Sequence, residues 1–162
     1  MARGRASRAR LVRLRLAARG RLAVSGAVHV ERGVRISVAR GARVSLEDGC
    51  RLGEGCRIEA ACGTVRIGTG ARLGERSVLA ARAGIDVGAG AIVGAWALVS
   101  DAEPTFADPE RPTRLQPLRA EPVRIGDRAR IGAHAAVQAG ATVAPGAVVG
   151  AYEVLTAPRR SA

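Results

Sequence analysis

Aliphatic residues recur at every sixth position along most of this chain. In the C-terminal part, the residues that begin six consecutive blocks of six are Ile125, Ile131, Val137, Val143, Val149 and Leu155. Shorter series with the same spacing begin at Val24, Leu46 and Ile67, and a slip of two residues restarts the last of them at Val87. An amphipathic helix repeats about every 3.6 residues and a half-buried strand about every two, so neither explains this period. The pattern predicts a different repeating unit, a short strand followed by a turn.

Short strands at this period predict a coil with three sides. Each side places one aliphatic residue in the interior, and the Gly, Ala, Asp and Ser residues between the strands suit the corners. Successive coils then stack as parallel strands about 4.8 Å apart. The repeats cover roughly 110 residues, so we expect an all-β fold, a parallel β-helix of hexapeptide repeats with about six coils and a length on the order of 30 Å.

The composition agrees with a thin aliphatic core. Aromatic residues make up only 2% of the chain, and packed cores of the usual kind depend on them for buried area. The net charge is +12, but all 26 basic residues are Arg, and the chain has no Lys or Asn. Such a composition is typical of a GC-rich genome. The overall charge is therefore not by itself a functional signal.

Residues 1–22 form a basic arm that precedes the repeats, and residues 1–21 contain eight Arg and no acidic residue. Alternation in "LVRLRL", residues 11–16, predicts a first strand that caps the open end of the prism. One alternative is an Arg-rich amphipathic helix that makes weak peripheral contact with an anionic membrane. Another is nucleic-acid binding, but the arm has no interleaved aromatic residues and no known motif, so we expect no nucleic-acid partner. Arg residues interrupt every apolar stretch of the arm, so we expect neither a secretory signal nor a membrane span. This favours a cytoplasmic protein.

Three cysteines lie six positions apart, at Cys50, Cys56 and Cys62. Each follows the leading aliphatic residue of its block by four positions, a position that favours small side chains facing the interior. Cysteine packs there as a small hydrophobic residue. A tetrahedral metal centre needs a fourth ligand, which is lacking, so we expect no metal. A carbonic anhydrase with three zinc-binding histidines is excluded because the chain has two His.

The stretch "VRIGDRARIGAHAAVQAGATVAPGAVVGAYEVLT" resembles the C-terminal half of the hexapeptide-repeat acyltransferases. These proteins fold as left-handed parallel β-helices, an exception to the usual right-handed crossover. The resemblance implies a left-handed β-helix domain over residues 23–156, followed by a tail of residues 157–162. It also implies a homotrimer that uses acetyl-CoA or another acyl-CoA as its co-substrate.

An excursion loop, residues 101–122, interrupts the repeats before the last coils. Its sequence, "SDAEPTFADPERPTRLQPLRAEPVRIGD" with the flanking residues, resembles the loop of the sugar O-acetyltransferase branch. In that branch, a loop histidine accepts the proton of the sugar hydroxyl that attacks the thioester. This chain has Ala102 and Pro104 at the histidine positions. Asp101 and Glu103 flank them and could act as bases if burial raises their pKa, the alternative being that both are solvated loop acids.

The C-terminal repeats contain the remaining candidate site residues. His134, in "IGAHAA", is a third candidate for the catalytic base, or else an ordinary surface histidine. The family binds coenzyme A along the outside of its C-terminal coils, between two subunits. The resemblance therefore points to Ala133, Ala151, Thr156 and Arg159 as residues that contact coenzyme A.

These observations together lead to one hypothesis and one alternative. The hypothesis is an acyltransferase that moves an acetyl or acyl group from acyl-CoA to a hydroxyl of a sugar or polysaccharide precursor. The alternative is a catalytically inactive β-helix that serves as a scaffold or accessory subunit, because general acid–base groups seldom have substitutes.

Overall fold

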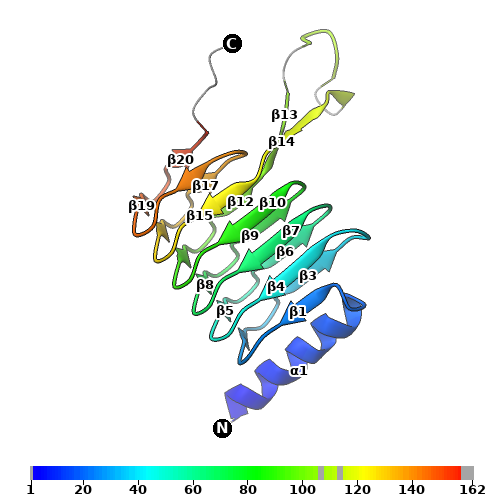
Figure 1. Cartoon of the computed structure of the whole chain (residues 1–162), viewed down its shortest axis with the longest axis vertical. Helices are drawn as coiled ribbons and strands as arrows, with labels where there is room; N and C mark the ends of the chain where they lie inside the picture. Colours follow the sequence, from blue (N-terminus) through cyan, green and yellow to red (C-terminus); the bar gives the residue numbers. More distant parts are fainter. Residues whose placement is uncertain (1, 106–107, 113–114, 158–162) are drawn as a thin grey trace.

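A parallel β-helix makes up most of the molecule. The computed structural model describes residues 2–105, 108–112 and 115–157. Figure 1 shows short strands that wind around one long axis, with helix α1 (Ala2–Ala17) lying across the N-terminal end. The strands form three six-stranded parallel sheets, here called sheets A, B and C, which the chain visits in that order in each coil. The prediction of an all-β parallel β-helix is confirmed, and its coils are consistent with the left-handed class.

Each sheet takes one short strand from every coil. Sheet A consists of β1 (Leu22–Val24), β4 (Arg43–Leu46), β7 (Thr64–Ile67), β10 (Gly84–Val87), β15 (Val123–Ile125) and β18 (Thr142–Val143). Sheet B consists of β2 (His29–Val30), β5 (Arg51–Leu52), β8 (Arg72–Leu73), β11 (Ile92–Val93), β16 (Arg130–Ile131) and β19 (Val148–Val149). Sheet C consists of β3 (Arg35–Val38), β6 (Arg57–Ala60), β9 (Val78–Ala81), β12 (Leu98–Ser100), β17 (Ala136–Val137) and β20 (Val154–Leu155).

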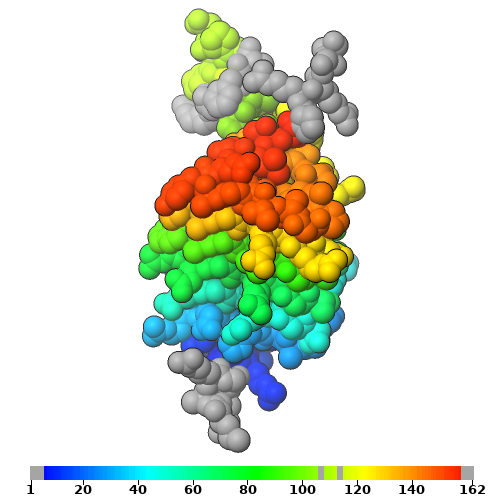
Figure 2. Space-filling model, turned by 90° about the vertical axis from the view of Figure 1, so that its left-hand side faces the viewer, coloured from blue at the N-terminus to red at the C-terminus, as the bar shows by residue number. Residues whose placement is uncertain are grey.

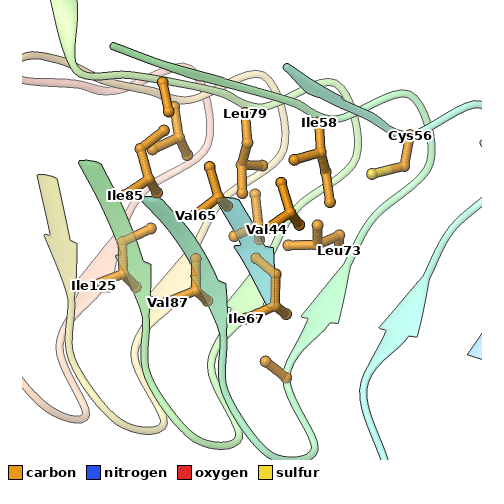
Figure 3. Packing of buried hydrophobic residues seen from close by; sticks show 14 of the residues in the cluster. Val44, Cys56, Ile58, Val65, Ile67, Leu73, Leu79, Ile85, Val87 and Ile125 are labelled. Atoms are coloured by element: carbon orange, nitrogen blue, oxygen red, sulfur yellow. The ribbon is translucent and has the colours of Figure 1, made fainter. Parts of the chain in front are cut away.

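Aliphatic side chains from the three sheets fill the interior. Parallel pairing places equivalent residues above one another, so that Val44 pairs with Val65 and Val65 pairs with Ile85. Figure 3 shows these side chains of sheet A together with Ile58 and Leu79 of sheet C, all directed into the core. Each of them is at most 1% exposed. Burial of such a side chain stabilises the fold by roughly 1.5–3 kcal/mol.

Coils in the N-terminal half are longer than those at the C-terminal end. Val44 pairs with Val65, 21 positions later, whereas Ile125 pairs with Val143, 18 positions later. Strands of sheet A such as β10 bury two residues, here Ile85 and Val87. The two-residue slip at Val87 therefore marks a second inward position on one strand, and the β-helix continues through it.

The N-terminal arm is a helix, so the prediction of a strand over residues 11–16 is wrong. The residues that face the coils are Ser7, Leu11, Leu14 and Ala18, at spacings of three and four. This is the helical repeat, and Ala, Leu and Arg are strong helix formers. The alternation of Leu and Arg is compatible with a strand over only six residues. The helical repeat extends over more residues, and together with the helix propensities of Ala, Leu and Arg it outweighs the short alternation.

Helix α1 caps the open end of the prism, the role expected of the arm. The amide of Val30 on β2 donates a hydrogen bond to Ser7 Oγ at 2.8 Å, and Arg10 donates one to the carbonyl oxygen of Val30 at 3.1 Å. These contacts satisfy backbone groups that an uncovered first coil would leave open to pairing with another chain. Among the described residues, no helix is long and apolar enough to cross a bilayer.

The three cysteines do not share one environment. Cys50 and Cys56 are fully buried, as predicted, but Cys62 is exposed. The prediction fails for Cys62 because the strand before it, β6, has four residues and already buries Ala60 at its end. Cys62 consequently lies in the turn between sheets C and A. Burial raises the pKa of the Cys50 thiol to about 12 and that of the Cys56 thiol to about 11.

We expect only one of the three thiols to react with iodoacetamide in the native protein. Near pH 8 the thiolate fractions of Cys50 and Cys56 are about 10⁻⁴ and 10⁻³ at the raised pKa values, and both sulfur atoms are buried. Mass spectrometry after labelling should locate the adduct on Cys62, and Cys62→Ser should remove it. Rapid native labelling of Cys50 or Cys56 would contradict this expectation.

Candidate functional site

The excursion leaves the β-helix at the corner between sheets C and A. Strand β13 (Ala102–Pro104) runs outward and pairs antiparallel with β14 (Leu118–Ala120), which returns the chain to β15. Figure 1 shows this hairpin projecting beyond the last coils. At the outer end of these strands, the amide of Thr105 donates a hydrogen bond to the carbonyl oxygen of Pro117 at 3.0 Å. The hairpin therefore begins as an ordered two-stranded element.

Asp101, at the start of the excursion, is buried, which contradicts the alternative of a solvated loop acid. Its side chain is 0% exposed. Its carboxylate oxygens accept hydrogen bonds from the backbone amides of Arg82 at 2.7 Å, Ala83 at 2.8 Å and Gly84 at 2.5 Å. Those residues form the same corner in the preceding coil. Both oxygens thus bond to the protein's own amides, a geometry that favours a structural role and disfavours proton abstraction.

Glu103 lies on the hairpin opposite a basic residue. It pairs in register with Arg119, and the carboxylate lies 3.7 Å from the guanidinium. Arg119 also donates a hydrogen bond to Glu121 at 3.1 Å. Ala102 and Pro104, the positions without the loop histidine, flank Glu103 on β13. The carboxylate is partly exposed and lies beside the Arg119 guanidinium.

Large side chains form a column at the corner between sheets B and C. In four successive coils the residues at this corner are Arg76, Trp96, His134 and Tyr152, with φ values of +52°, +60°, +58° and +62°. The two preceding coils have glycine at the same position. A left-handed backbone costs a residue other than glycine roughly 1–2 kcal/mol. The side chains must therefore contribute interactions that offset this strain.

The side chains of this corner column stack on one another. The imidazole of His134 is within 5° of parallel to the Trp96 indole, at a centroid distance of 6.1 Å, and within 2° of parallel to the Tyr152 ring, at 4.9 Å. The guanidinium of Arg76 lies 4.9 Å from the centroid of the indole, a cation–π contact. The faces of the imidazole are covered, whereas its nitrogen atoms lie at the ring edge, where they can reach a ligand.

Small residues run beside this column. Ala133 and Ala151 precede His134 and Tyr152, and the amide of Tyr152 donates a hydrogen bond to the carbonyl oxygen of Ala133 at 3.0 Å. The backbones approach closely here, since a Cβ atom on Gly94 would lie only 2.6 Å from the amide nitrogen of Ala133. Ala151 is exposed and Ala133 is partly exposed, so only small side chains lie beside the main chain at this corner.

The predicted site residues fall into two groups within one chain. Ala133, Ala151 and His134 lie together at the corner between sheets B and C. Asp101 and Glu103 lie at the corner between sheets C and A. Exposed Thr156 follows β20, at the far end of sheet C from Ala151. Arg159 lies outside the described residues.

The sequence prediction omitted Trp96 and Tyr152. A signal for them exists, because the chain reads "VGAW" at residues 93–96, "IGAH" at 131–134 and "VGAY" at 149–152. The large side chain follows Val or Ile, then Gly and Ala, each time. Alignment by coil places the three rings in one column. No group of three or more His, Cys, Asp or Glu side chains that could bind a metal occurs within the described part of the chain.

The chain is a parallel β-helix built from six-residue repeats. Residues 64–95 and 122–157 match the family model described as the hexapeptide repeat of succinyl-transferase. The two matched segments lie on either side of the excursion. A comparison with curated proteins found no significant match.

Solved structures of an N-acyltransferase have a similar fold. A single-site mutant of AntD from Bacillus cereus, in complex with dTDP and coenzyme A, has a TM-score of 0.70 and 19% identity over 83% of this chain and 73% of that chain. Another AntD mutant, in complex with dTDP-4-amino-4,6-dideoxyglucose and coenzyme A, has a TM-score of 0.60 and 20% identity over 82% and 71%. Similarity at this level of identity establishes the shared fold.

Proposed function

We propose that this protein is an acyltransferase that moves an acetyl or other acyl group from acyl-CoA to a hydroxyl or amine of a sugar. The proposed acceptor is a sugar nucleotide or polysaccharide precursor in the cytoplasm. The hexapeptide repeats and the fold shared with AntD, which binds coenzyme A and dTDP-sugars, support this assignment. The observation that carries the proposal is the corner where Ala133 and Ala151 leave the backbone accessible beside the imidazole of His134.

In the proposed reaction, His134 accepts the proton of the attacking hydroxyl or amine. The acceptor oxygen or nitrogen forms a bond to the thioester carbonyl carbon, and the carbon–sulfur bond breaks. Coenzyme A leaves as a thiolate, which takes the proton from the imidazolium and restores neutral His134. The rings of Trp96 and Tyr152 stack parallel to the imidazole on its two sides and hold its orientation.

The proposed site lies between subunits of a homotrimer. Within one chain, the hairpin leaves at a different corner from the one that carries His134. A neighbouring copy packed side by side would bring its hairpin, including Glu103, next to this corner. The outer face of sheet C offers apolar area for that contact, because Leu98 is 44% exposed and Val154 is 56% exposed.

Binding of coenzyme A, measured by isothermal titration calorimetry, tests the proposal. We expect the wild-type protein to bind coenzyme A and Ala133→Glu to weaken binding at least about tenfold, since the longer, charged side chain would occupy the space beside the main chain that the ligand needs. The matched control is Ala144→Glu, which adds the same charge at the exposed corner between sheets A and B and should leave affinity unchanged. Absence of coenzyme A binding by the wild-type protein would contradict the acyltransferase proposal.

A catalytically inactive scaffold or accessory subunit is the second candidate. The observation that favours it is the loop itself, where Asp101 is bonded to amides, Glu103 is paired with Arg119, and histidine is absent. This candidate is compatible with coenzyme A binding and with its absence. It predicts that no free thiol is released from acetyl-CoA in the presence of sugar acceptors. Thiol release that depends on an added acceptor would exclude it.

A further inference from the structure

The surface of α1 that faces away from the coils is strongly basic. Arg8, Arg13 and Arg15 are exposed on it, and Arg19 is exposed in the turn that follows. No carboxylate in the described part of the chain lies within 4.0 Å of these four guanidinium groups. The first acidic residue of the chain is Glu31.

Some arginines on the side of the prism are paired with carboxylates, among them Arg66. Arg66 on β7 donates hydrogen bonds to Glu47 at 2.7 Å and to Asp86 at 2.8 Å, from the coils on either side. The hydrogen bond from Arg66 lowers the pKa of Glu47. The fold can therefore neutralise an arginine with carboxylates from neighbouring coils. The outer face of α1 has no such partners, and its charges remain available to an anion outside the molecule.

Two aliphatic side chains stand among these arginines. Val12 is 55% exposed and Leu16 is 73% exposed, and they lie one helical turn apart. They are on the opposite side of the helix from Leu11 and Leu14, which pack against the core. The helix thus has two apolar stripes, of which only the inner one is used by the fold.

We propose that the outer face of α1 binds the surface of an anionic lipid bilayer. Guanidinium groups pair with anionic headgroups, while Val12 and Leu16 enter the boundary between headgroups and acyl chains. A nucleic acid would use only the charges, because its phosphate backbone offers the two aliphatic side chains no apolar region. The chain also has no aromatic residue before Trp96 on which a base could stack.

Binding through this surface would determine the orientation of the β-helix relative to the bilayer. Figure 1 shows α1 at one end of the long axis and the hairpin of β13 and β14 at the other. Figure 2 shows the coils as successive layers between these ends. Docking through α1 places the prism end-on, with the corner that carries His134 along its side and accessible from solution. The inference does not depend on the proposed transferase activity.

Cosedimentation of the full-length protein with vesicles tests this inference. We expect binding to phosphatidylcholine vesicles that contain about 30% phosphatidylserine, little binding to pure phosphatidylcholine, and weakening as salt is raised. The triple variant Arg8→Gln, Arg13→Gln, Arg15→Gln should lower the partition coefficient on the order of 10²-fold, since each arginine near the surface contributes roughly fivefold. Thermal melting should show that this variant remains folded, because all three side chains are exposed.

Two further variants make the test specific. The matched control removes three exposed arginines from the sides of the prism, as Arg72→Gln, Arg82→Gln, Arg124→Gln, and should retain vesicle binding. The variant Val12→Ser, Leu16→Ser should bind vesicles several-fold more weakly and leave any retention by duplex DNA unchanged. Equal losses in the two arginine variants, or failure of the wild-type protein to bind anionic vesicles, would overturn the inference. Full vesicle binding by the serine variant, with DNA a stronger ligand than vesicles, would instead assign the surface to nucleic acid.

Discussion

Replacement of Asp101 by alanine is expected to lower the free energy of unfolding by about 3–5 kcal/mol. The carboxylate is fully buried and accepts hydrogen bonds from the amides of Arg82, Ala83 and Gly84. Alanine removes the acceptor and leaves these three donors without their partner in the protein. For a chain of this size, the loss corresponds to a fall in melting temperature of about 10 °C.

The comparison that makes this result informative is Asp108→Ala. Asp108 is exposed, and its carboxylate accepts one amide hydrogen bond within its own turn, from Glu110 at 3.0 Å. Its removal should change the free energy of unfolding by no more than about 0.5 kcal/mol. Differential scanning calorimetry of both variants measures the difference. Similar melting temperatures for Asp101→Ala and Asp108→Ala would show that the buried carboxylate does not stabilise the corner.

Replacement of His134 by asparagine is expected to reduce kcat for acyl transfer by about 10²- to 10⁴-fold, the contribution of a general base. Asparagine suits this test because it tolerates the left-handed backbone at φ +58°. It retains a polar side chain but cannot accept the proton of the acceptor hydroxyl or amine. Coenzyme A affinity should change little, since Ala133 and Ala151 are unaltered. Thiol release from acetyl-CoA with sugar acceptors is the assay.

The matched control for this variant is His29→Asn, the only other histidine in the chain. His29 lies on β2 near α1, where its imidazole is 3.4 Å from Glu31. Its replacement should leave acyl transfer unchanged. Equal activity of His134→Asn and the wild-type protein would refute His134 as the base. Glu103→Gln then becomes the next variant to measure, because Glu103 is the partly exposed carboxylate of the hairpin.

Much of the fold could be predicted because each coil repeats the same constraint. One aliphatic residue in six turns inward on every side, as Ile125, Ile131 and Val137 do in one coil, and parallel stacking preserves this alignment from coil to coil. Failures of the prediction occurred where the repeat itself ends or changes length. Strand β6 before Cys62 has four residues, so Cys62 lies in the turn instead of facing the interior. In the arm, the alternation of Leu and Arg over six residues suggests a strand, but the longer segment has a helical repeat and forms a helix.

The candidate site could be predicted only in part, because it depends on contacts between coils. The resemblance to the hexapeptide-repeat acyltransferases implies Ala133 and Ala151, and His134 adjoins Ala133 in the same repeat. The stack of His134 between Trp96 and Tyr152 joins residues from three coils, with the excursion inserted between the first two. The residues near His134 in the sequence do not indicate which residues of other coils contact its ring. Trp96 and Tyr152 could therefore be identified as its partners only from the structure.

The sequence by itself determined the β-helix, the position of the excursion and the absence of histidine from it, because hydrophobic spacing and residue identity are local properties. Only the tertiary structure decided that the arm is a capping helix, that Asp101 is buried against three amides, and that the single Trp and Tyr flank His134. The physical reason is that burial, hydrogen-bond partners and ring stacking depend on which coils become neighbours. Paired neighbours from successive coils are 18 or more residues apart along the chain.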